Sequence, residues 1–174
     1  MEPPAIEPDV KDWTFTITDG CGECGFDPSY DVTATGERLR ATVPAYVAAL
    51  ARPDVAQRPA PSTWSPLEYG CHVRDVFALF GERLALMLDE DDPLFANWDQ
   101  DATAVEERYW EQDPVEVADA LTHAAAATAA AFDAVRPDQW ERTVRRSNGS
   151  EFTVRTLAVY CLHDIEHHLV DVGS

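Results

Sequence analysis

Basic residues are scarce in this sequence. Thirteen Lys and Arg, with Lys11 the only lysine, stand against 32 Asp and Glu, so the formal net charge of the 174-residue chain is −19 at pH 7. Such a surface repels phosphate groups. The charge balance therefore argues against nucleic acid, and against an anionic membrane surface, as a partner.

Long apolar runs are also lacking, and no stretch approaches the roughly 20 residues of a membrane-spanning helix. The first ten residues are acidic and proline-containing and include no basic residue, unlike a signal peptide. We therefore expect a cytoplasmic protein. In that compartment the four cysteines should be thiols or metal ligands rather than disulfides: Cys21, Cys24, Cys71 and Cys161.

The chain divides into an arm and a body. Residues 1–32 are polar, contain a Cys-x-x-Cys pattern, and are expected to form an extended arm or loop. From residue 33 onward, apolar residues at helical spacing predict a helix that Thr35 caps and that ends near Ala51. Ser65 followed by Pro66 and Glu68 is a strong start signal for a second helix, expected to run to about Leu88.

The second half of the chain predicts two more helices. The acidic segment 89–113 is expected to be a connector with a short helix near 102–111. Asp113 and Pro114 begin an alanine-rich third helix, predicted over 115–135. Residues 142–152 predict a short hairpin around Asn148-Gly149, and Thr153 caps a last helix over 154–172. The predicted fold is an all-α four-helix bundle over residues 33–174.

Histidines are concentrated in one motif near the end of the last helix, while His123 stands alone. Residues four apart on a helix lie one above the other, and the motif offers two such pairs. Helical phase points the pair Asp164/His168 most directly inward and leaves His163/His167 on a flank.

His72, at the edge of the apolar stripe of the second helix, could complete either pair. One histidine and a histidine–carboxylate pair make a three-ligand site with open positions, which suits Zn²⁺, Ni²⁺, Fe²⁺ or Mn²⁺. The competing interpretation is that these histidines only stabilise the negative end of the helix.

Three motifs resemble the DinB-like superfamily of metal-binding four-helix bundles, and its actinobacterial members most closely: Trp64-Ser65-Pro66-Leu67-Glu68, His72-Val73-Arg74-Asp75 and His163-Asp164-Ile165-Glu166-His167-His168-Leu169. The resemblance spans about residues 35–172. The relatives of these actinobacterial members include mycothiol-dependent transferases and isomerases. The resemblance therefore implies a divalent metal, commonly zinc or nickel, that activates a low-molecular-weight thiol.

The resemblance also implies the ligands. Carried over by motif, they are His72, Asp164 and His168. The carboxylate departs from the commoner all-histidine trio, so His163 and His167 remain the alternative register.

Cys21-Gly22-Glu23-Cys24-Gly25 is similar to half of a zinc knuckle. A structural loop over the mouth of the bundle is the preferred interpretation. Ligands of a shared zinc come next, and a redox pair with a low thiol pKa comes last. Cys71 and Cys161 are interpreted as ordinary buried thiols.

The leading functional hypothesis is a metal-dependent transferase or isomerase that joins a small thiol, such as mycothiol, to a small electrophile. Arg74, Arg145 and Arg146 are candidates to bind substrate carboxylates. One alternative is a metal-dependent hydrolase with Asp75 or Glu68 as base. Another is a non-catalytic metal-binding stress or sensor module, with the aromatics of residues 94–110 serving a homodimer.

Overall fold

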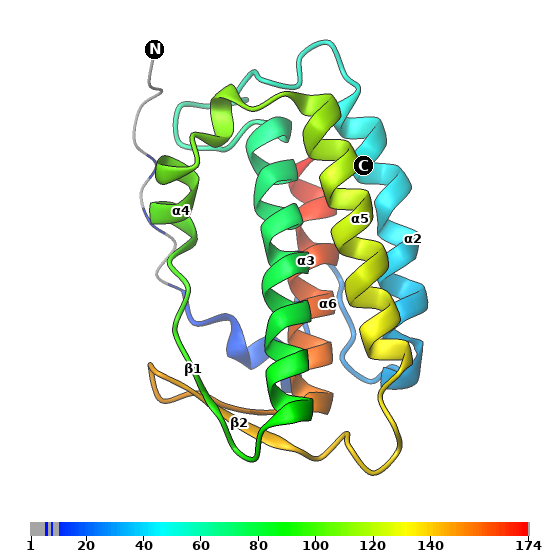
Figure 1. Ribbon diagram of the computed structural model, residues 1–174. Coiled ribbons are helices and arrows are strands. Elements are labelled where there is room, and N and C mark those ends of the chain that lie inside the picture. The colour runs from blue at the N-terminus through cyan, green and yellow to red at the C-terminus, as the bar shows by residue number, and fades with distance from the viewer. Residues whose placement is uncertain (1–5, 7, 9–10, 174) are drawn as a thin grey trace.

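Four long helices form the body of the protein. The structure is a computed structural model that describes residues 6, 8 and 11–173. The two helices α2 (Thr35–Leu50) and α3 (Pro66–Asp89) each pack against both α5 (Pro114–Asp133) and α6 (Val154–Asp171) (Figure 1). This arrangement confirms the predicted four-helix bundle.

Side-chain caps fix where three of these helices begin. Ser65 begins α3 and Thr153 begins α6, each within a reciprocal capping box, and Asp113 caps α5 ahead of Pro114. These three predicted starts are confirmed. Each cap satisfies backbone amides of the first turn and so fixes the residue at which its helix begins.

The predicted cap of α2 was wrong. Thr35 lies inside the first turn of α2, and its hydroxyl donates a 2.7 Å hydrogen bond to the carbonyl of Val32. The chain enters the helix through the 3₁₀ turn η2 (Val32–Ala34), which is capped by Asp31. Asp31, one turn earlier, therefore provides the side-chain cap that was expected from Thr35.

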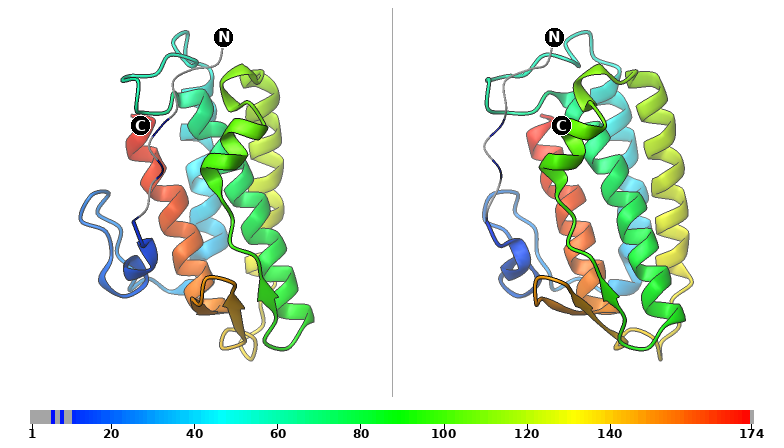
Figure 2. Two further views of the ribbon diagram at one scale, coloured as in Figure 1. Left: turned by 90° about the vertical axis from the view of Figure 1, so that its left-hand side faces the viewer. Right: turned by 60° about the vertical axis from the view of Figure 1, so that its left-hand side comes forward.

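The fold is mostly helical rather than purely α, because a small three-stranded sheet closes one end of the bundle (Figure 2). The predicted hairpin is present as β2 (Thr143–Arg146) and β3 (Glu151–Thr153). The unpredicted third strand, β1 (Leu94–Phe95), pairs in parallel with β2. A two-residue strand is too short to carry a periodic pattern, so tertiary docking alone creates it.

The acidic connector folds onto the body. It contains α4 (Gln100–Glu106) and the 3₁₀ turn η3 (Tyr109–Glu111) where one short helix was predicted. Phe95 and Tyr109 are buried. Aromatic rings of this segment thus serve the chain's own core, and the homodimer stays a prediction.

The amino-terminal arm is more structured than the expected extended segment. It forms the turn η1 (Trp13–Phe15) and the single-turn helix α1 (Thr16–Asp19), followed by a loop. The α1 helix packs against α6, and Figure 2 shows the arm running beside that helix. The arm therefore covers a flank of α6 that the bundle helices leave uncovered.

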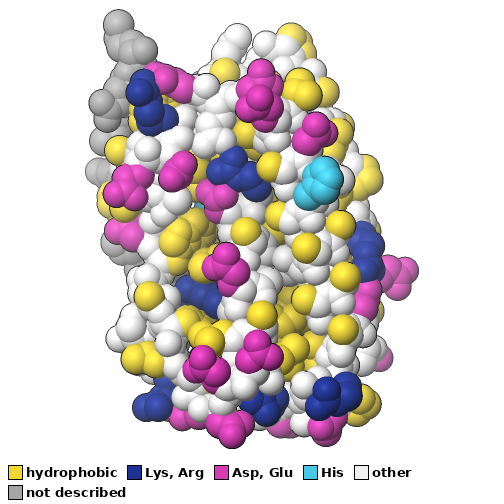
Figure 3. Space-filling model, in the orientation of Figure 1, with side chains coloured by type: hydrophobic (Ala, Val, Ile, Leu, Met, Phe, Trp, Pro, Cys, Tyr) yellow, Lys and Arg dark blue, Asp and Glu magenta, His cyan; other side chains and the backbone are white. Residues whose placement is uncertain are grey.

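Acidic and basic side chains are interspersed on the face of the molecule that Figure 3 shows. Many are paired, for example Arg145 with Asp92 and Arg155 with Glu141. Among the helices that the structure describes, none is long and apolar enough to cross a bilayer.

Candidate metal centre

The last helix presents two ligand pairs side by side. Asp164 and His168 lie one turn apart and face the space between α3 and α6, while His163 and His167 lie one residue earlier on the adjoining flank. Two clusters result. His72 lies beside Asp164 and His168, whereas Cys21 and Cys24 lie beside His163 and His167.

His72 is fully buried, and neither ring nitrogen has a hydrogen-bond partner among the described residues. A buried imidazole that lacks both bonds is costly unless something else binds it. Its ring stacks on Trp98, with centroids 5.5 Å apart and planes inclined by 8°, and lies 5.3 Å from the ring of Trp64. The aromatic contacts fix the ring while leaving Nε2 directed at the ligand pair of α6.

The distances among these three residues match a metal site. Asp164 Oδ1 lies 3.5 Å from His72 Nε2 and 3.4 Å from His168 Nε2. Two ligand atoms each about 2.1 Å from a tetrahedral zinc are about 3.4 Å apart. One atom from each residue lies within 4.8 Å of the others. The set of two imidazoles and one carboxylate fits a divalent metal of the zinc or nickel type.

A second carboxylate orients one of the ligands. His168 shares a 2.7 Å hydrogen bond through Nδ1 with Asp171 Oδ2, which leaves Nε2 facing Asp164. Metal-binding histidines characteristically hold an outer carboxylate in this way. Asp171 belongs to the same helix one turn later, so the helix itself supplies both sides of the ring.

The carboxylates and imidazoles of the cluster shift one another's pKa values. Burial lowers the pKa of His72. Burial acts in the same direction on His168, but Asp164 and Asp171 outweigh it and raise the pKa of that imidazole to about 9. For Asp164, burial alone would raise the pKa, yet the adjacent imidazoles of His168 and His72 hold it well below its usual range. A metal would have to displace the proton of His168.

A cavity of about 230 Å³ is lined by Asp164 and His168, whereas His72 is fully buried and is not part of its lining. A larger hollow of about 470 Å³ adjoins it. Both are bordered by Trp13 from the arm and Tyr160 from α6. The remaining residues that line the smaller cavity are Tyr69, Gln100, His163, His167 and Asp171.

Sequence reasoning placed some of these residues and missed others. Tyr160 and Asp171 share the inward face of α6 with Asp164, so helical phase could find them. Trp13 and Gln100 come from the arm and the connector. No periodic pattern ties either segment to the site, because loop docking determines their positions.

The three candidate substrate arginines all interact with polar side chains outside the metal cluster. Arg74 pairs with Asp75 at 2.7 Å, and Arg145 pairs with Asp92 at 3.1 Å. Arg146 donates to Asn148 and borders the larger hollow. Of the three, Arg146 alone stands where it could meet a ligand that extends out of the metal cavity.

The two carboxylates considered as a base are also held away from the cavity. Glu68 binds Arg58 and the Ser65 cap, and Asp75 accepts hydrogen bonds from Arg74 and the Tyr109 hydroxyl. The four residues that fix them explain why neither reaches the metal cluster.

Cys71 and Cys161 belong to neither cluster. Both are buried, and burial raises the pKa of Cys71 to about 12 and that of Cys161 well above its usual value. Burial also raises the pKa of Cys24 to about 11, which is the opposite of what a redox pair requires.

Comparison with known proteins identifies the fold. The family profile described as the DinB superfamily matches residues 35–171, which include all four bundle helices. The chain belongs to the DinB superfamily. A solved structure described as "YfiT from Bacillus subtilis is a probable metal-dependent hydrolase with an unusual four-helix bundle topology" is similar, with a TM-score of 0.69, 17% sequence identity and 81% of each chain covered. A comparison with curated protein sequences gives no match.

Proposed function

We propose that this DinB-superfamily protein is a metal-dependent enzyme that joins a small thiol, of the mycothiol type, to a small electrophile. The observation that carries the proposal is the cluster of His72, Asp164 and His168, whose candidate ligand atoms converge beside a cavity. Neither ring nitrogen of His72 has a hydrogen-bond partner among the described residues.

Three protein ligands leave at least one coordination position for a substrate, which distinguishes catalytic from structural sites. A divalent metal held there, zinc or nickel, supplies Lewis acidity that lowers the pKa of a bound thiol or water. The chain's own part is to hold the ligands. Trp98 and Trp64 fix the His72 ring, and Asp171 fixes the His168 ring.

The lining of the cavity favours a thiol over water as the nucleophile. Its carboxylates are Asp164 and Asp171, and both interact with His168. Neither is therefore available as a general base for a water molecule. A thiol has a much lower pKa than water and needs no such base once its proton has left to solvent.

Space for a large thiol is present. The hollow of about 470 Å³ extends from the metal cavity past Trp13 and Tyr160 toward Arg146. A cofactor with its sulfur at the ligand cluster could place its polar remainder there. The aromatic walls would exclude water from the reacting atoms.

The proposed reaction is the addition of the thiol to an activated carbon–carbon double bond. The thiol loses its proton, and its sulfur donates an electron pair to an activated carbon–carbon double bond. A sulfur–carbon bond forms, the π bond breaks, and the neighbouring carbon takes up a proton. If the adduct then rotates about the new carbon–carbon single bond and eliminates the thiol, the double bond returns with the opposite geometry. In that case the protein would be an isomerase, and the thiol would not be consumed.

The similarity to YfiT supports a second candidate, metal-dependent hydrolysis, because that protein is described as a probable hydrolase. It requires the same three ligands and an ester or amide substrate in place of the thiol and electrophile. The two candidates therefore differ in substrate and share the metal centre.

Turnover assays distinguish them. Zinc- or nickel-loaded protein is mixed either with mycothiol and an activated alkene such as ethacrynic acid or with p-nitrophenyl acetate alone. We expect thiol conjugation, its loss in His72→Ala, and its retention in His123→Ala, a histidine exposed on α5. Ester cleavage without conjugation would establish the hydrolase. Metal binding without either activity would establish a non-catalytic module.

A further inference from the structure

We propose that Cys21, Cys24, His163 and His167 form a second, closed zinc site that fastens the amino-terminal arm to α6. Their ligand atoms all lie within 4.8 Å of one another. This site is independent of the proposed reaction, since it shares no ligand with the cluster around His72.

The arm presents its two cysteines from a tight loop. The backbone of Cys21 pairs with that of Phe26, and the amide of Gly25 donates a 2.8 Å hydrogen bond to the carbonyl of Cys21. Gly25 has φ +77°, a conformation that favours glycine. Gly20, at φ +73°, also approaches closely, since a Cβ there would lie 2.6 Å from the carbonyl oxygen of Phe26. The loop thus turns both thiols toward α6.

The helix presents its two histidines one turn apart on the flank that the arm covers. His163 is only 3% exposed, and its Nε2 has no hydrogen-bond partner among the described residues. The rings of Trp13 and Phe26 lie 5.6 and 5.3 Å from its ring. Such a buried nitrogen requires a ligand or carries a desolvation cost.

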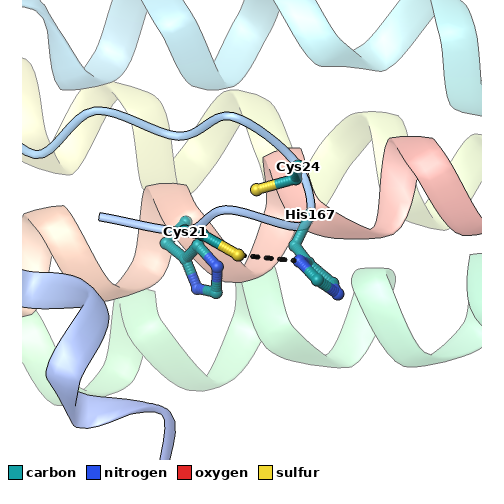
Figure 4. A group of neighbouring side chains, drawn as sticks. Cys21, Cys24 and His167 are labelled. Carbon is teal, nitrogen blue, oxygen red and sulfur yellow. Dashed lines mark hydrogen bonds between the residues drawn. The ribbon is translucent and has the colours of Figure 1, made fainter. Parts of the chain in front are cut away.

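The distance between a cysteine sulfur and a histidine nitrogen of this cluster matches that of a zinc site. Cys21 Sγ lies 3.7 Å from His167 Nδ1, and Figure 4 shows Cys24 beside this contact. A sulfur and a nitrogen bound to the same tetrahedral zinc are about 3.6 Å apart. Two thiolates and two imidazoles fill all four positions, so the site is structural rather than catalytic.

The remaining cysteines show what an ordinary buried thiol looks like in this fold. Cys71 and Cys161 are fully buried within bundle helices and belong to neither of the two clusters. By contrast, Cys21, which is buried, and Cys24, which is half-buried, lie in the arm and face two histidines of another element. The pairing links segments about 140 residues apart, as the 146-residue separation of Cys21 and His167 shows.

A zinc ion here would also affect the neighbouring candidate metal centre, because His163 and His167 border the same cavity. His163 and His167 immediately precede Asp164 and His168, and Trp13 of the fastened arm forms a wall of the cavity. Holding the arm against α6 therefore keeps that wall in place. Binding of the ion would also be coupled to folding of the arm, as is usual for structural zinc.

Metal content is the first test. Protein purified under reducing conditions and saturated with zinc is analysed for zinc per chain after gel filtration. We expect about two ions, because each cluster holds one. The double variant Cys21→Ser/Cys24→Ser and the variant His72→Ala should each lose one ion. Gly22→Ala should lose none, since a Cβ there meets nothing within 4 Å.

The same series separates this proposal from the proposed function. If His72→Ala keeps all of its zinc while the double cysteine variant loses its ion, the metal centre of the enzyme fails and the structural site stands. If the cysteine variant keeps the full content and His72→Ala loses one ion, the structural site is overturned.

A measurement on the unmodified chain avoids variants that fail to fold. Cobalt is titrated into metal-free protein, and thiolate-to-cobalt charge transfer is followed in the near ultraviolet. We expect an intense thiolate band that is complete by two cobalt ions per chain, because the cluster around His72 takes up cobalt without contributing to the band. Bound metal should also protect Cys21 and Cys24 from alkylation. Absence of the band, or a Cys21–Cys24 disulfide in protein isolated without an oxidant, would overturn the proposal.

Discussion

Asp171 Oδ2 lies 2.7 Å from His168 Nδ1, on the side of the ring opposite the proposed metal centre. This hydrogen bond determines which ring nitrogen can face Asp164. It also raises the electron density on that nitrogen, since the carboxylate stabilises positive charge on the imidazole. A residue that would touch no metal thus controls a ligand that would.

The variant Asp171→Asn tests this relationship. We expect the affinity of the metal centre to fall about 10- to 100-fold, because the ring loses its fixed orientation and some of its basicity. Competition with a chromophoric chelator measures the change. Asp138→Asn, which changes an exposed carboxylate outside both clusters, is the matched control. Equal affinities in the two variants would show that the hydrogen bond does not orient the ligand.

Trp98 supplies the other support, through its stack on His72. Its indole is also anchored by a 2.9 Å hydrogen bond from Nε1 to Thr103 Oγ1. We expect Trp98→Leu to weaken metal binding by about tenfold, because water would gain access to the buried ring. Trp110→Leu in the same segment provides the control. The chelator assay decides, and unchanged affinity in Trp98→Leu would count against a role in the site.

The sequence could predict which side of each helix faces inward because residues of one kind recur at helical spacing. In α3, His72 falls at the edge of the apolar stripe. In α6, Arg155 and Glu166 mark the solvent face, and Asp164 and His168 then point inward. Their role as ligands stays a prediction, but their convergence follows from local signals alone.

What covers a helix flank could not be predicted in this way. His163 was expected on a flank, yet it is almost completely buried because Trp13 and Phe26 of the arm lie against it. The arm has no helical period that would reveal its docking. The short strand β1 escaped prediction for the same physical reason, since a neighbour rather than its own sequence creates it.

Stability should depend on pH through Glu68. Burial alone would raise the pKa of its carboxyl, but the hydrogen bonds from Arg58 and Ser65 outweigh burial and lower the pKa below its usual value. A carboxyl with a lowered folded pKa contributes stability above its unfolded pKa of about 4.3, and loses it as the pH falls through the folded pKa.

The variant Glu68→Gln should therefore be destabilised at pH 7, by about 3 kcal/mol, because the half-buried charge of Arg58 loses this buried carboxylate. The gap between wild type and variant should shrink as the pH is lowered below about 4. Urea unfolding across that range measures it. Glu141→Gln removes an exposed pair and should behave like wild type at every pH. A gap that is constant with pH would refute the assignment.

Close packing of α2 on α5 should make Gly36 intolerant of a side chain. A Cβ at this position would lie 2.6 Å from the carbonyl oxygen of Ala129, a backbone atom that cannot move away without displacing the helix. We expect Gly36→Ala to destabilise the protein by about 1 to 3 kcal/mol, despite the higher helix propensity of alanine. Gly22→Ala makes the same chemical change in open space and should leave the urea midpoint unchanged. If Gly36→Ala were as stable as wild type or more so, the two helices would have to lie farther apart than the structure places them.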